Sequence, residues 1–424
     1  MLTRFCNISQ SIDFLLSCDN INFVYSFSVF YHFMKICLIH NLYEPYARGG
    51  AEQVVKATID FLLSQNNEVI LITLASEKEE FSKSDKLKIY RLKQKNIFSF
   101  FDLDKHNFLS KFVWHLINIF NLPVSKRVSE ILQEEKPDIV HTHNLMGLSF
   151  LIPKKIRKLK IKNIHTVHDV QLVEPSGIII KTKENSWRHK CLLMQLHIFI
   201  MKKLIGSPDI VISPSKFLLN FYKQKGFFPK SKLQVLANPL TLQVPDGFQK
   251  QEHSGFNFLY LGQIEKHKGV YELLQTFQNI DNANLHVVGD GSELENLKNK
   301  FANLENIKFY GRKSREKLPA IFATTDVLIF SSLCYENYPA VIFESFQFGV
   351  PVLSVNHSSL PEFIKEGENG WFFDVLNTED LKNKIVWCLQ NKTDITNMSA
   401  KMSQNLSSID NNNYFQKLIT FYKN

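Results

Sequence analysis

The amino-acid sequence predicts an α/β protein of two doubly wound Rossmann-like domains that face each other across a cleft. Two series of short apolar runs alternate with longer segments of helical periodicity, and a stretch poor in apolar residues separates the two series. Such alternation is typical of βαβ units and parallel sheets. The length of 424 residues fits two or three domains of ordinary size.

The first series begins at Met34. Residues 1–33 are expected to be either an N-terminal extension or the result of a non-native start before Met34, and Asp13 and Asp19 leave no apolar stretch there long enough for a secretory signal. Residues 34–240 form the expected first domain. Its expected strands span residues 35–40, 68–74, 88–92, 138–143, 164–168, 210–213 and 235–236, and its expected helices span residues 52–64 and 126–135.

Residues 241–254 form the expected linker, because the chain around them contains proline, glycine and glutamine but few apolar side chains. Residues 255–400 form the second domain, and residues 401–424 a helical segment expected to pack back on the first domain. The second domain's expected strands span residues 256–262, 284–289, 307–310, 327–331, 352–355 and 370–373, and its helices span residues 269–278, 293–302, 315–323, 340–348 and 378–389.

Composition excludes several classes of protein. Hydrophobic residues make up 44% of the chain and charged residues 21%, so a packed core rather than disorder is expected. The six cysteines are dispersed without a CxxC pair, which argues against a zinc ribbon, a thioredoxin site or a disulfide scaffold. Dispersed thiols fit a reducing cytoplasm. No apolar run reaches 18 residues, so no membrane-spanning helix is expected.

The net charge of +9 is concentrated in the first half of the chain. Residues 1–250 carry 34 Lys+Arg and 21 Asp+Glu, whereas residues 251–424 carry 16 and 20. Anionic membrane and nucleic acid are the two partners that such a basic half suggests, and a solvated surface is the alternative. The basic side chains include Lys154, Lys155, Arg157, Lys158, Lys160 and Lys162, and others flank the apolar segment 191–205, which could also be a core helix.

Candidate binding residues in the first domain follow two expected strands. Gly49 and Gly50 lie between the first strand and the first helix, where glycine allows close backbone approach and the helix start offers N–H groups to an anion. His168 ends another strand and is therefore well placed to face a cleft. The alternative is that it is a loop histidine hydrogen-bonded to Asp169. The His141-Thr142-His143 run could suggest a metal site, but no further matching residues support one.

The second domain has its own candidates. Gly262, Gln263 and Lys268 lie in the turn between its first strand and first helix, where a lysine could pair with phosphate. Glu336 and Glu344 flank the start of a later helix, near Pro339. Two carboxylates there could bind sugar hydroxyls while the helix start binds an anion. Surface acids are the alternative, although Glu344 lies in an apolar run, where a carboxylate needs a partner.

Taken together, these features resemble the family-4 glycosyltransferases, which are retaining enzymes of the GT-B fold that include bacterial surface-polysaccharide enzymes. The resemblance covers residues from about 34 to 390. It is carried by IHNLYEPYARGGAEQVV, PDIVHTHN, TVHD, DIVISPSKF and VLANP in the first domain, and by FLYLGQIEKHKGVYELLQTF, VVGDGSE, FYGR, TTDVLIFSS and YENYPAVIFESFQFGVPVL in the second.

The resemblance implies catalytic roles for His168 beside the transferred sugar, Lys268 on the diphosphate and Glu336 on the sugar hydroxyls. It implies that the first domain binds the acceptor and the second the nucleotide sugar, with Glu344 accepting the ribose hydroxyls. The donor-binding residues that it implies are Gly49, Gly50, Gly262, Gln263, Lys268, Arg312, Glu336, Asn337, Tyr338, Pro339, Ala340, Val341 and Glu344. Gln263 departs from the arginine usual in the family, which puts donor affinity in question.

The implied reaction moves a sugar from a UDP- or GDP-linked donor to a glycan or lipid-linked acceptor, in capsule or lipopolysaccharide assembly, without a metal ion or other cofactor. A location in the cytoplasm, peripheral on the inner face of the membrane, is expected. Two alternatives stay open: a sugar-nucleotide epimerase of the same shape, and a non-catalytic sugar-nucleotide-binding protein. An NAD dehydrogenase is disfavoured because no GxGxxG is followed by an acid, and a nucleic-acid partner would leave the glutamate pair unexplained.

Overall fold

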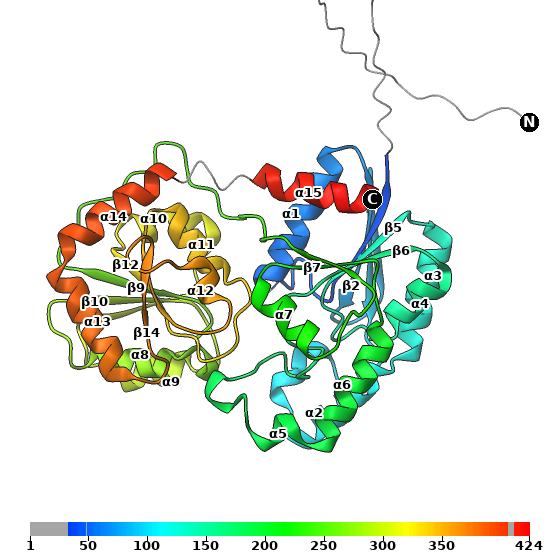
Figure 1. The fold of residues 1–424 in the computed structure, drawn as a ribbon, viewed down its shortest axis with the longest axis horizontal. Coiled ribbons are helices and arrows are strands. Elements are labelled where there is room, and N and C mark those ends of the chain that lie inside the picture. The colour runs from blue at the N-terminus through cyan, green and yellow to red at the C-terminus, as the bar shows by residue number, and fades with distance from the viewer. Residues whose placement is uncertain (1–32, 48, 406–410) are drawn as a thin grey trace, which may run out of the picture.

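A computed structural model describes residues 33–47, 49–405 and 411–424 of the chain. The expected N-terminal extension therefore lies, except for Phe33, outside the described residues, as does Arg48. The described chain forms two α/β domains that lie side by side (Figure 1). Within the described residues, no helix is both long enough and apolar enough to cross a bilayer.

The first domain contains an eight-stranded sheet with the order β3-β4-β2-β1-β5-β6-β7-β8. Neighbouring strands run parallel except for the antiparallel pair of β3 and β4. The strands are β1 (Lys35–Ile39), β2 (Glu68–Ala75), β3 (Glu80–Ser84), β4 (Leu87–Lys93), β5 (Ile139–Thr142), β6 (Lys162–Thr166), β7 (Ile210–Ser213) and β8 (Lys232–Val235).

The second domain contains a six-stranded sheet, all parallel, with the order β11-β10-β9-β12-β13-β14. Both sheets are doubly wound, because the strand order reverses between β1 and β5 in one and between β9 and β12 in the other. The fold class predicted from the sequence is thus confirmed. The strands are β9 (Asn257–Leu261), β10 (Asn284–Val288), β11 (Ile307–Gly311), β12 (Val327–Phe330), β13 (Val352–Val355) and β14 (Gly370–Phe373).

The first sheet buries both faces, as its alternating side chains require. Ile36 and Leu38 of β1 pack in one core with helix α1, whereas Cys37 and Ile39 pack in another core with α3, α4 and α6. The helices of this domain are α1 (Gly50–Ser64), α2 (Phe108–Ile119), α3 (Leu122–Glu135), α4 (Ile152–Leu159), α5 (Trp187–Lys190), α6 (Leu192–Ile205) and α7 (Lys216–Gln224), with short 3₁₀ turns at η1 (Phe100–Lys105) and η2 (Lys181–Lys183).

Five helices and one strand of the first domain are absent from the elements expected from the sequence. The strand β3 was missed because all five of its residues are exposed and its sequence, EFSKS, has no apolar alternation. The absent helices are α2, α4, α5, α6 and α7, although α6 corresponds to segment 191–205, for which a core helix is one of two interpretations. The strand expected at residues 235–236 is β8, which begins three residues earlier and ends at Val235.

The second domain packs its helices around a single core rich in phenylalanine, including Phe258, Phe277, Phe322 and Phe348. Gly269 begins its first helix with φ +68°, and a Cβ at this position would lie 2.1 Å from the Ser331 carbonyl oxygen, so only glycine fits. The helices are α8 (Val270–Phe277), α9 (Leu294–Lys300), α10 (Leu318–Ala323), α11 (Ala340–Gln347), α12 (Leu360–Phe363), α13 (Thr378–Gln390) and α14 (Lys392–Asn405), with 3₁₀ turns η3 (Lys266–Lys268) and η4 (Arg315–Lys317).

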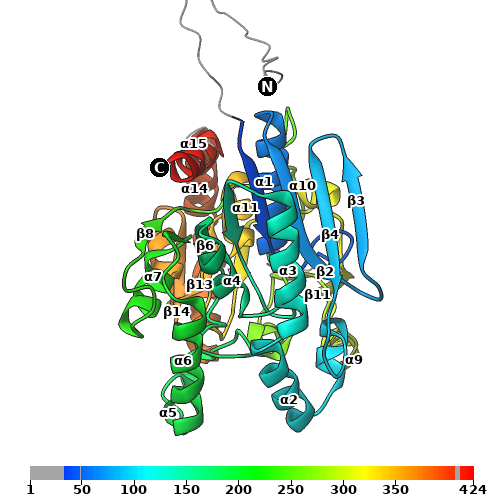
Figure 2. The same cartoon turned by 90° about the vertical axis from the view of Figure 1, so that its right-hand side faces the viewer.

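The last helix, α15 (Asn411–Lys423), lies on the first domain rather than the second, beside α1 (Figures 1 and 2). Tyr414, Leu418 and Tyr422 are buried there in the core that contains α1. The Tyr422 hydroxyl bonds His141 Nδ1 at 2.8 Å, and Lys162 Nζ donates to the Tyr422 carbonyl at 2.8 Å. The C-terminal part of the chain therefore contacts both domains, with α14 packed on the second domain and α15 on the first.

Several hydrogen bonds join the two domains directly. Residues 179–181 of the first domain run against residues 333–335 of the second: Lys181 N donates to the Leu333 carbonyl at 2.8 Å, and Ile180 and Cys334 form an antiparallel bridge. Glu362 of α12 accepts the backbone N–H of Lys216, in the first turn of α7, at 2.8 Å. The two domains are therefore in direct contact through backbone and side-chain hydrogen bonds.

Candidate active site

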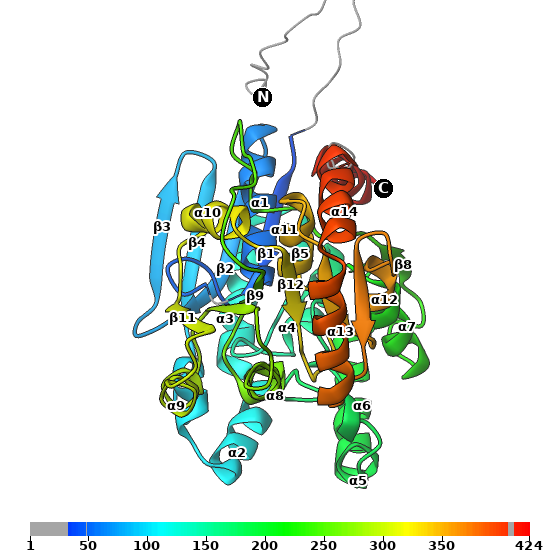
Figure 3. The same ribbon diagram turned by 90° about the vertical axis from the view of Figure 1, so that its left-hand side faces the viewer.

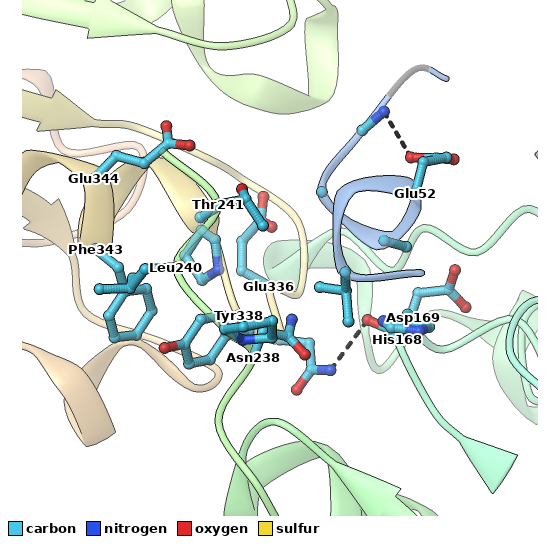
Figure 4. A pocket seen from close by; sticks show the side chains of 18 of the residues that line it. Glu52, His168, Asp169, Asn238, Leu240, Thr241, Glu336, Tyr338, Phe343 and Glu344 are labelled. Atoms are coloured by element: carbon cyan, nitrogen blue, oxygen red, sulfur yellow. Dashed lines mark hydrogen bonds between the residues drawn. The ribbon is translucent and has the colours of Figure 1, made fainter. Parts of the chain in front are cut away.

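A cavity of about 380 Å³ lies between the domains at the carboxyl ends of both sheets. This is where ligands bind in doubly wound folds, next to the points where strand order reverses. Figure 4 shows Glu336 and Glu344 on one side of this cavity and Glu52, His168 and Asp169 on the other. The cavity is lined by Gly49, Gly50, Ala51, Glu52, Val54, Asn144, His168, Asp169, Asn238, Pro239, Leu240, Thr241, Gln263, Glu336, Asn337, Tyr338, Pro339, Ala340, Phe343 and Glu344.

Two helix N-termini meet in this cavity. Gly50 is the first residue of α1 and Ala340 is the first residue of α11. A Cβ atom placed on Gly50 would lie 3.8 Å from the Ala340 Cβ. Because the start of a helix carries unpaired N–H groups and a partial positive charge, two converging helix starts favour a bound anion.

Glu336 forms a buried ion pair with Lys268 at the wall of the cavity. Lys268 Nζ donates to Glu336 Oε1 at 2.7 Å, and Ser332 Oγ donates to the same oxygen at 2.6 Å. Burial raises the pKa of Glu336, but the charge and hydrogen bond of Lys268 outweigh burial and leave the pKa below its ordinary value. Burial lowers the pKa of Lys268, whereas Glu336 raises it, with a net rise to about 12. Both groups are therefore charged at neutral pH.

Glu344 lies one helical turn into α11 and pairs with Arg315 of the turn η4. Arg315 Nη2 donates to Glu344 Oε1 at 2.9 Å and to Thr241 Oγ1 at 3.1 Å. Arg312, which the sequence places among the donor-binding residues, has an exposed side chain and does not line the cavity. The arginine beside Glu344 comes three residues later, on the 3₁₀ turn that leads into α10.

His168 contacts another histidine rather than Asp169. Its Nε2 lies 2.9 Å from His143 Nδ1, and its backbone carbonyl accepts a hydrogen bond from Asn337 Nδ2 at 3.1 Å. Burial holds the pKa of both His143 and His168 well below the ordinary 6.5. His168 is therefore neutral at pH 7 and can contact hydroxyl groups, but it contributes no positive charge.

Glu52 is a cavity residue that sequence reasoning missed. Its Oε2 accepts the Gly49 N–H at 2.8 Å and so caps α1, and its Oε1 lies 3.8 Å from His40 Nε2. Burial raises the pKa of Glu52, but the neighbouring His40 and the hydrogen bond from the Gly49 N–H lower it overall. An acid three residues after the cap position is the sequence signal that could have revealed this contact.

Asp169 and residues at the start of the segment between the domains also line the cavity without having been predicted from the sequence. Asp169 Oδ1 accepts the Gln171 N–H at 2.8 Å, and Asn144 Nδ2 lies 3.3 Å from its other oxygen. The segment that connects the domains, taken here from residue 238 onward, contributes Asn238, Leu240 and Thr241 to the cavity. Asn238 belongs to the VLANP motif, but Leu240 and Thr241 carry no sequence signal, since a segment without regular structure shows no periodicity.

The structure brings together most of the residues expected from the sequence. Four do not line the cavity. Lys268 is hydrogen-bonded to Glu336 and does not reach the cavity surface. Gly262 donates its backbone N–H to the Val288 carbonyl of the sheet at 3.0 Å. Val341 packs against the second core, and Arg312 faces solvent. The expected residues that do line it are Gly49, Gly50, His168, Gln263, Glu336, Asn337, Tyr338, Pro339, Ala340 and Glu344.

Among the described residues, no group of three or more His, Cys, Asp or Glu side chains is arranged to bind a metal ion. His141 and His143, the pair considered for a metal, instead bond to neighbouring side chains. His141 Nε2 lies 2.8 Å from Thr166 Oγ1, and His143 Nδ1 is occupied by His168.

The buried histidines beneath the cavity should make the fold sensitive to mild acid. Burial lowers the pKa of His141 from 6.5 to about 3, that of His165 to about 4, and that of His143 well below 6.5. The unfolded chain therefore binds more protons below pH 6.5, and stability falls as pH falls. Each of the three should cost about 1.4 kcal/mol between pH 7.5 and 5.5. Urea unfolding at the two pH values measures this, and equal stability at both would contradict it.

This fold and this cavity define a two-domain transferase of the GT-B type, and comparison with known proteins agrees. Residues 48–244 match the family model described as glycosyltransferase family 4, and residues 247–407 match the one described as glycosyl transferases group 1. The two matches fall on the two α/β domains and together cover most of the chain. The chain belongs to the family-4 glycosyltransferases, as its motifs had suggested.

One relative and two solved structures illustrate the likeness. An uncharacterized 42.6 kDa protein in the cps region of Klebsiella pneumoniae is 31% identical over 213 residues, which span 50% of this chain and only 57% of that protein. Sucrose-phosphate synthase from Thermosynechococcus elongatus matches with a TM-score of 0.72 and 16% identity, covering 92% of this chain and 98% of that one. HepE of Anabaena in complex with UDP-glucose matches with a TM-score of 0.67 and 14% identity, covering 92% and 99%. At these identities the solved structures show the fold.

Proposed function

We propose that this protein is a retaining glycosyltransferase. It moves a sugar from a UDP- or GDP-linked donor to a glycan or lipid-linked acceptor, with no metal ion or other cofactor. One observation carries the proposal: the starts of α1 and α11 converge in a cavity whose wall holds Glu336 and Glu344. A diphosphate suits the helix starts, and the hydroxyl groups of a sugar and a ribose suit the two carboxylates. The UDP-glucose complex of HepE supports a sugar nucleotide as donor.

The charges of the cavity fit the demands of glycosyl transfer. As the bond to the diphosphate breaks, positive charge grows on the sugar and negative charge grows on the leaving oxygen. Lys268 and the two helix starts stabilise that negative charge. Glu336 keeps Lys268 oriented and faces the sugar hydroxyls, and neutral His168 contacts the sugar from the other domain. In a retaining course the acceptor attacks the same face of the sugar, and the departing phosphate takes its proton.

Gln263 is the feature that could weaken donor binding, because the family usually has arginine here. Its side chain is exposed at the edge of the cavity. Its backbone carbonyl accepts a hydrogen bond from the Tyr260 hydroxyl at 2.6 Å. Of the two nearby lysines, Lys266 is 85% exposed and lies 3.6 Å from Glu293. Lys268 is therefore the cation assigned to the diphosphate, with glutamine rather than arginine at position 263.

Thermal unfolding in the presence of UDP, GDP, ADP or CMP, each with EDTA, tests the proposal. One nucleotide diphosphate at about 100 times its dissociation constant should add about 2.7 kcal/mol of apparent stability. The replacement Glu344→Ala should abolish that gain, because Glu344 is the carboxylate assigned to the ribose. Glu305→Ala, at an exposed glutamate of the same domain, is the matched control and should keep the gain.

The same measurement separates the alternatives. No stabilisation by any nucleotide would contradict a sugar-nucleotide site altogether, and stabilisation that EDTA removes would contradict metal independence. Stabilisation without transfer to any glycan or lipid-linked acceptor would favour the non-catalytic binding protein. Interconversion of the free sugar nucleotide would favour the epimerase. The family matches favour neither of these two.

We place the acceptor on the first domain and the protein in the cytoplasm, at the inner face of the membrane. The support is the basic first half of the chain and the cps region in which the Klebsiella relative is found. A capsule or lipopolysaccharide precursor that is attached to lipid would present its sugar end at this surface. Nucleic acid is not part of the proposal.

A further inference from the structure

Helices α2, α5 and α6 of the first domain expose many large apolar side chains. This apolar end consists of seven residues whose side chains are at least half exposed: Phe108 (78%), Leu109 (70%), Trp187 (80%), Leu192 (85%), Leu193 (58%), Leu196 (50%) and Phe199 (56%). Exposure of so many large apolar side chains at one end of a domain is unusual for a soluble surface and indicates a site of interaction.

The apolar end forms one region of the molecule. Helices α2, α5 and α6 lie at the same end of the first domain in all three views (Figures 1, 2 and 3). Burial and, to a smaller extent, the nearby His197 of α6 lower the pKa of His115 of α2, so the two helices are neighbours at these residues. Glu174, which is buried, holds α5 in place by accepting from Arg188 Nη2 at 2.8 Å.

Helix α6 is divided between two environments. Ile198, Met201 and Leu204 are buried in the core of the first domain, whereas Leu192 and Phe199 face outward. The two interpretations of segment 191–205, a core helix and a surface helix, therefore each describe one side of the same helix. The apolar side chains on the inner side are buried by the first domain, whereas those on the outer side remain exposed.

Charge identifies what could cover the outer side. Residues 107–129 and 185–208 contain no Asp or Glu, but they contain Lys111, Arg188, Lys190, Lys202 and Lys203. Helices α2, α5 and α6 carry exposed apolar side chains and, within their own bounds, only basic charges, which fits the interface of a bilayer that contains anionic lipid. A second copy of the chain fits poorly, because a symmetric contact would bring the same basic residues together.

We propose that the apolar end binds the surface of an anionic membrane, with α2, α5 and α6 inserted among the lipid headgroups. The inference deepens the proposed function and rests on it for the lipid-linked acceptor. The segment just before α5 supports a link to the site, because Lys181 N bonds the Leu333 carbonyl, three residues before Glu336. Helix α4, with exposed Lys154, Lys158 and Lys160, lies farther from this end in Figures 1 to 3.

Flotation of the full chain with phosphatidylcholine vesicles, with and without 50% phosphatidylglycerol, tests the proposal. We expect binding to the anionic vesicles only. The triple replacement of Phe108, Leu192 and Phe199 by serine should weaken that binding at least tenfold. Replacing Lys154, Lys155, Lys158 and Lys160 by glutamate should weaken it much less, because α4 lies outside the apolar end.

The outcomes separate lipid binding from donor binding. The serine variant should keep the nucleotide-dependent thermal shift of the parent, which shows both that it is folded and that the donor site is intact. A parent that does not float with anionic vesicles, or a serine variant that floats as well as the parent, would overturn the proposal. So would sedimentation showing a dimer that the serine replacements dissociate, since a second copy would then be the occupant. If the thermal shift is absent while flotation behaves as expected, the donor proposal fails alone.

Discussion

Replacing Lys268 with alanine should reduce sugar transfer on the order of 10²–10³-fold, which is the range for losing one preorganised group that stabilises developing charge. The side chain of Lys268 is 22% exposed and that of Glu336 is 14% exposed, so the 2.7 Å contact between them lies largely outside solvent. The variant loses the cation assigned to the leaving diphosphate. It also leaves the Glu336 carboxylate without its partner, beside the point where negative charge develops.

The matched control is Lys266→Ala. Lys266 lies in the same 3₁₀ turn but is 85% exposed, and its contact with Glu293 at 3.6 Å is too open to contribute much. Its replacement should change transfer less than twofold. Because breaking a buried pair can cost about 3–5 kcal/mol, the melting temperature of Lys268→Ala must also be measured. Steady-state rates from a folded Lys268→Ala protein within threefold of the parent would rule out the assigned role.

The ion pair should not contribute to the pH profile of the enzyme near neutrality. The pKa of Glu336 is depressed, so its stabilising contribution is present above the ordinary value of 4.5 and is lost as pH falls below it. The pKa of Lys268 is raised from 10.5 to about 12, so its contribution is present below 10.5 and is lost as pH rises through 12. Any change in rate between pH 6 and 9 therefore originates in other groups.

The glutamate pair could be predicted from the sequence because its geometry is local. Glu336 and Glu344 belong to one loop and the helix that follows it, so their spacing places both carboxylates near the same helix start. Both sheets could be predicted for a similar reason. Each buried parallel strand is a short apolar run, and its neighbours along the chain are helices of clear periodicity.

The partners of those carboxylates could not be predicted, because they come from distant parts of the chain. Arg315, rather than Arg312, reaches Glu344. Arg315 is the first residue of the 3₁₀ turn η4, whereas Arg312 lies before that turn. Thr241 reaches the same guanidinium from the connecting segment, 74 residues away along the chain. Glu52 and Asp169 enter the cavity only because the two domains close on each other.

The apolar end shows a different limit of sequence reasoning. Apolar residues at helical spacing normally face a core, and nothing in segment 191–205 says which side of the helix will be covered. Only the packing of Ile198 and Met201 against the first domain shows that Leu192 and Phe199 remain outside. The same holds for Phe108 and Leu109 in α2.

Asn337 should prove to be the side chain that sets the distance between the domains at the site. It is buried, and it spans the cleft next to Glu336. Its Nδ2 donates to the carbonyls of His168 and Val167 at 3.1 and 3.3 Å, and its Oδ1 accepts from Ser215 Oγ, which also caps α7. One amide thus fixes Glu336 of one domain relative to His168 of the other.

The replacement Asn337→Asp keeps the shape of the side chain but removes both donated hydrogen bonds and places a carboxylate against two carbonyl oxygens. We expect kcat/KM to fall about 10²-fold, the cost of misplacing reacting groups by about 1 Å. Nucleotide affinity should change less than threefold, because Glu344 and Arg315 lie within the second domain. Asn303→Asp, at an exposed asparagine of that domain, adds the same charge and should leave both quantities unchanged. A fall in nucleotide affinity that matches the fall in kcat/KM would instead mean that Asn337 contacts the donor and does not act by holding the domains together.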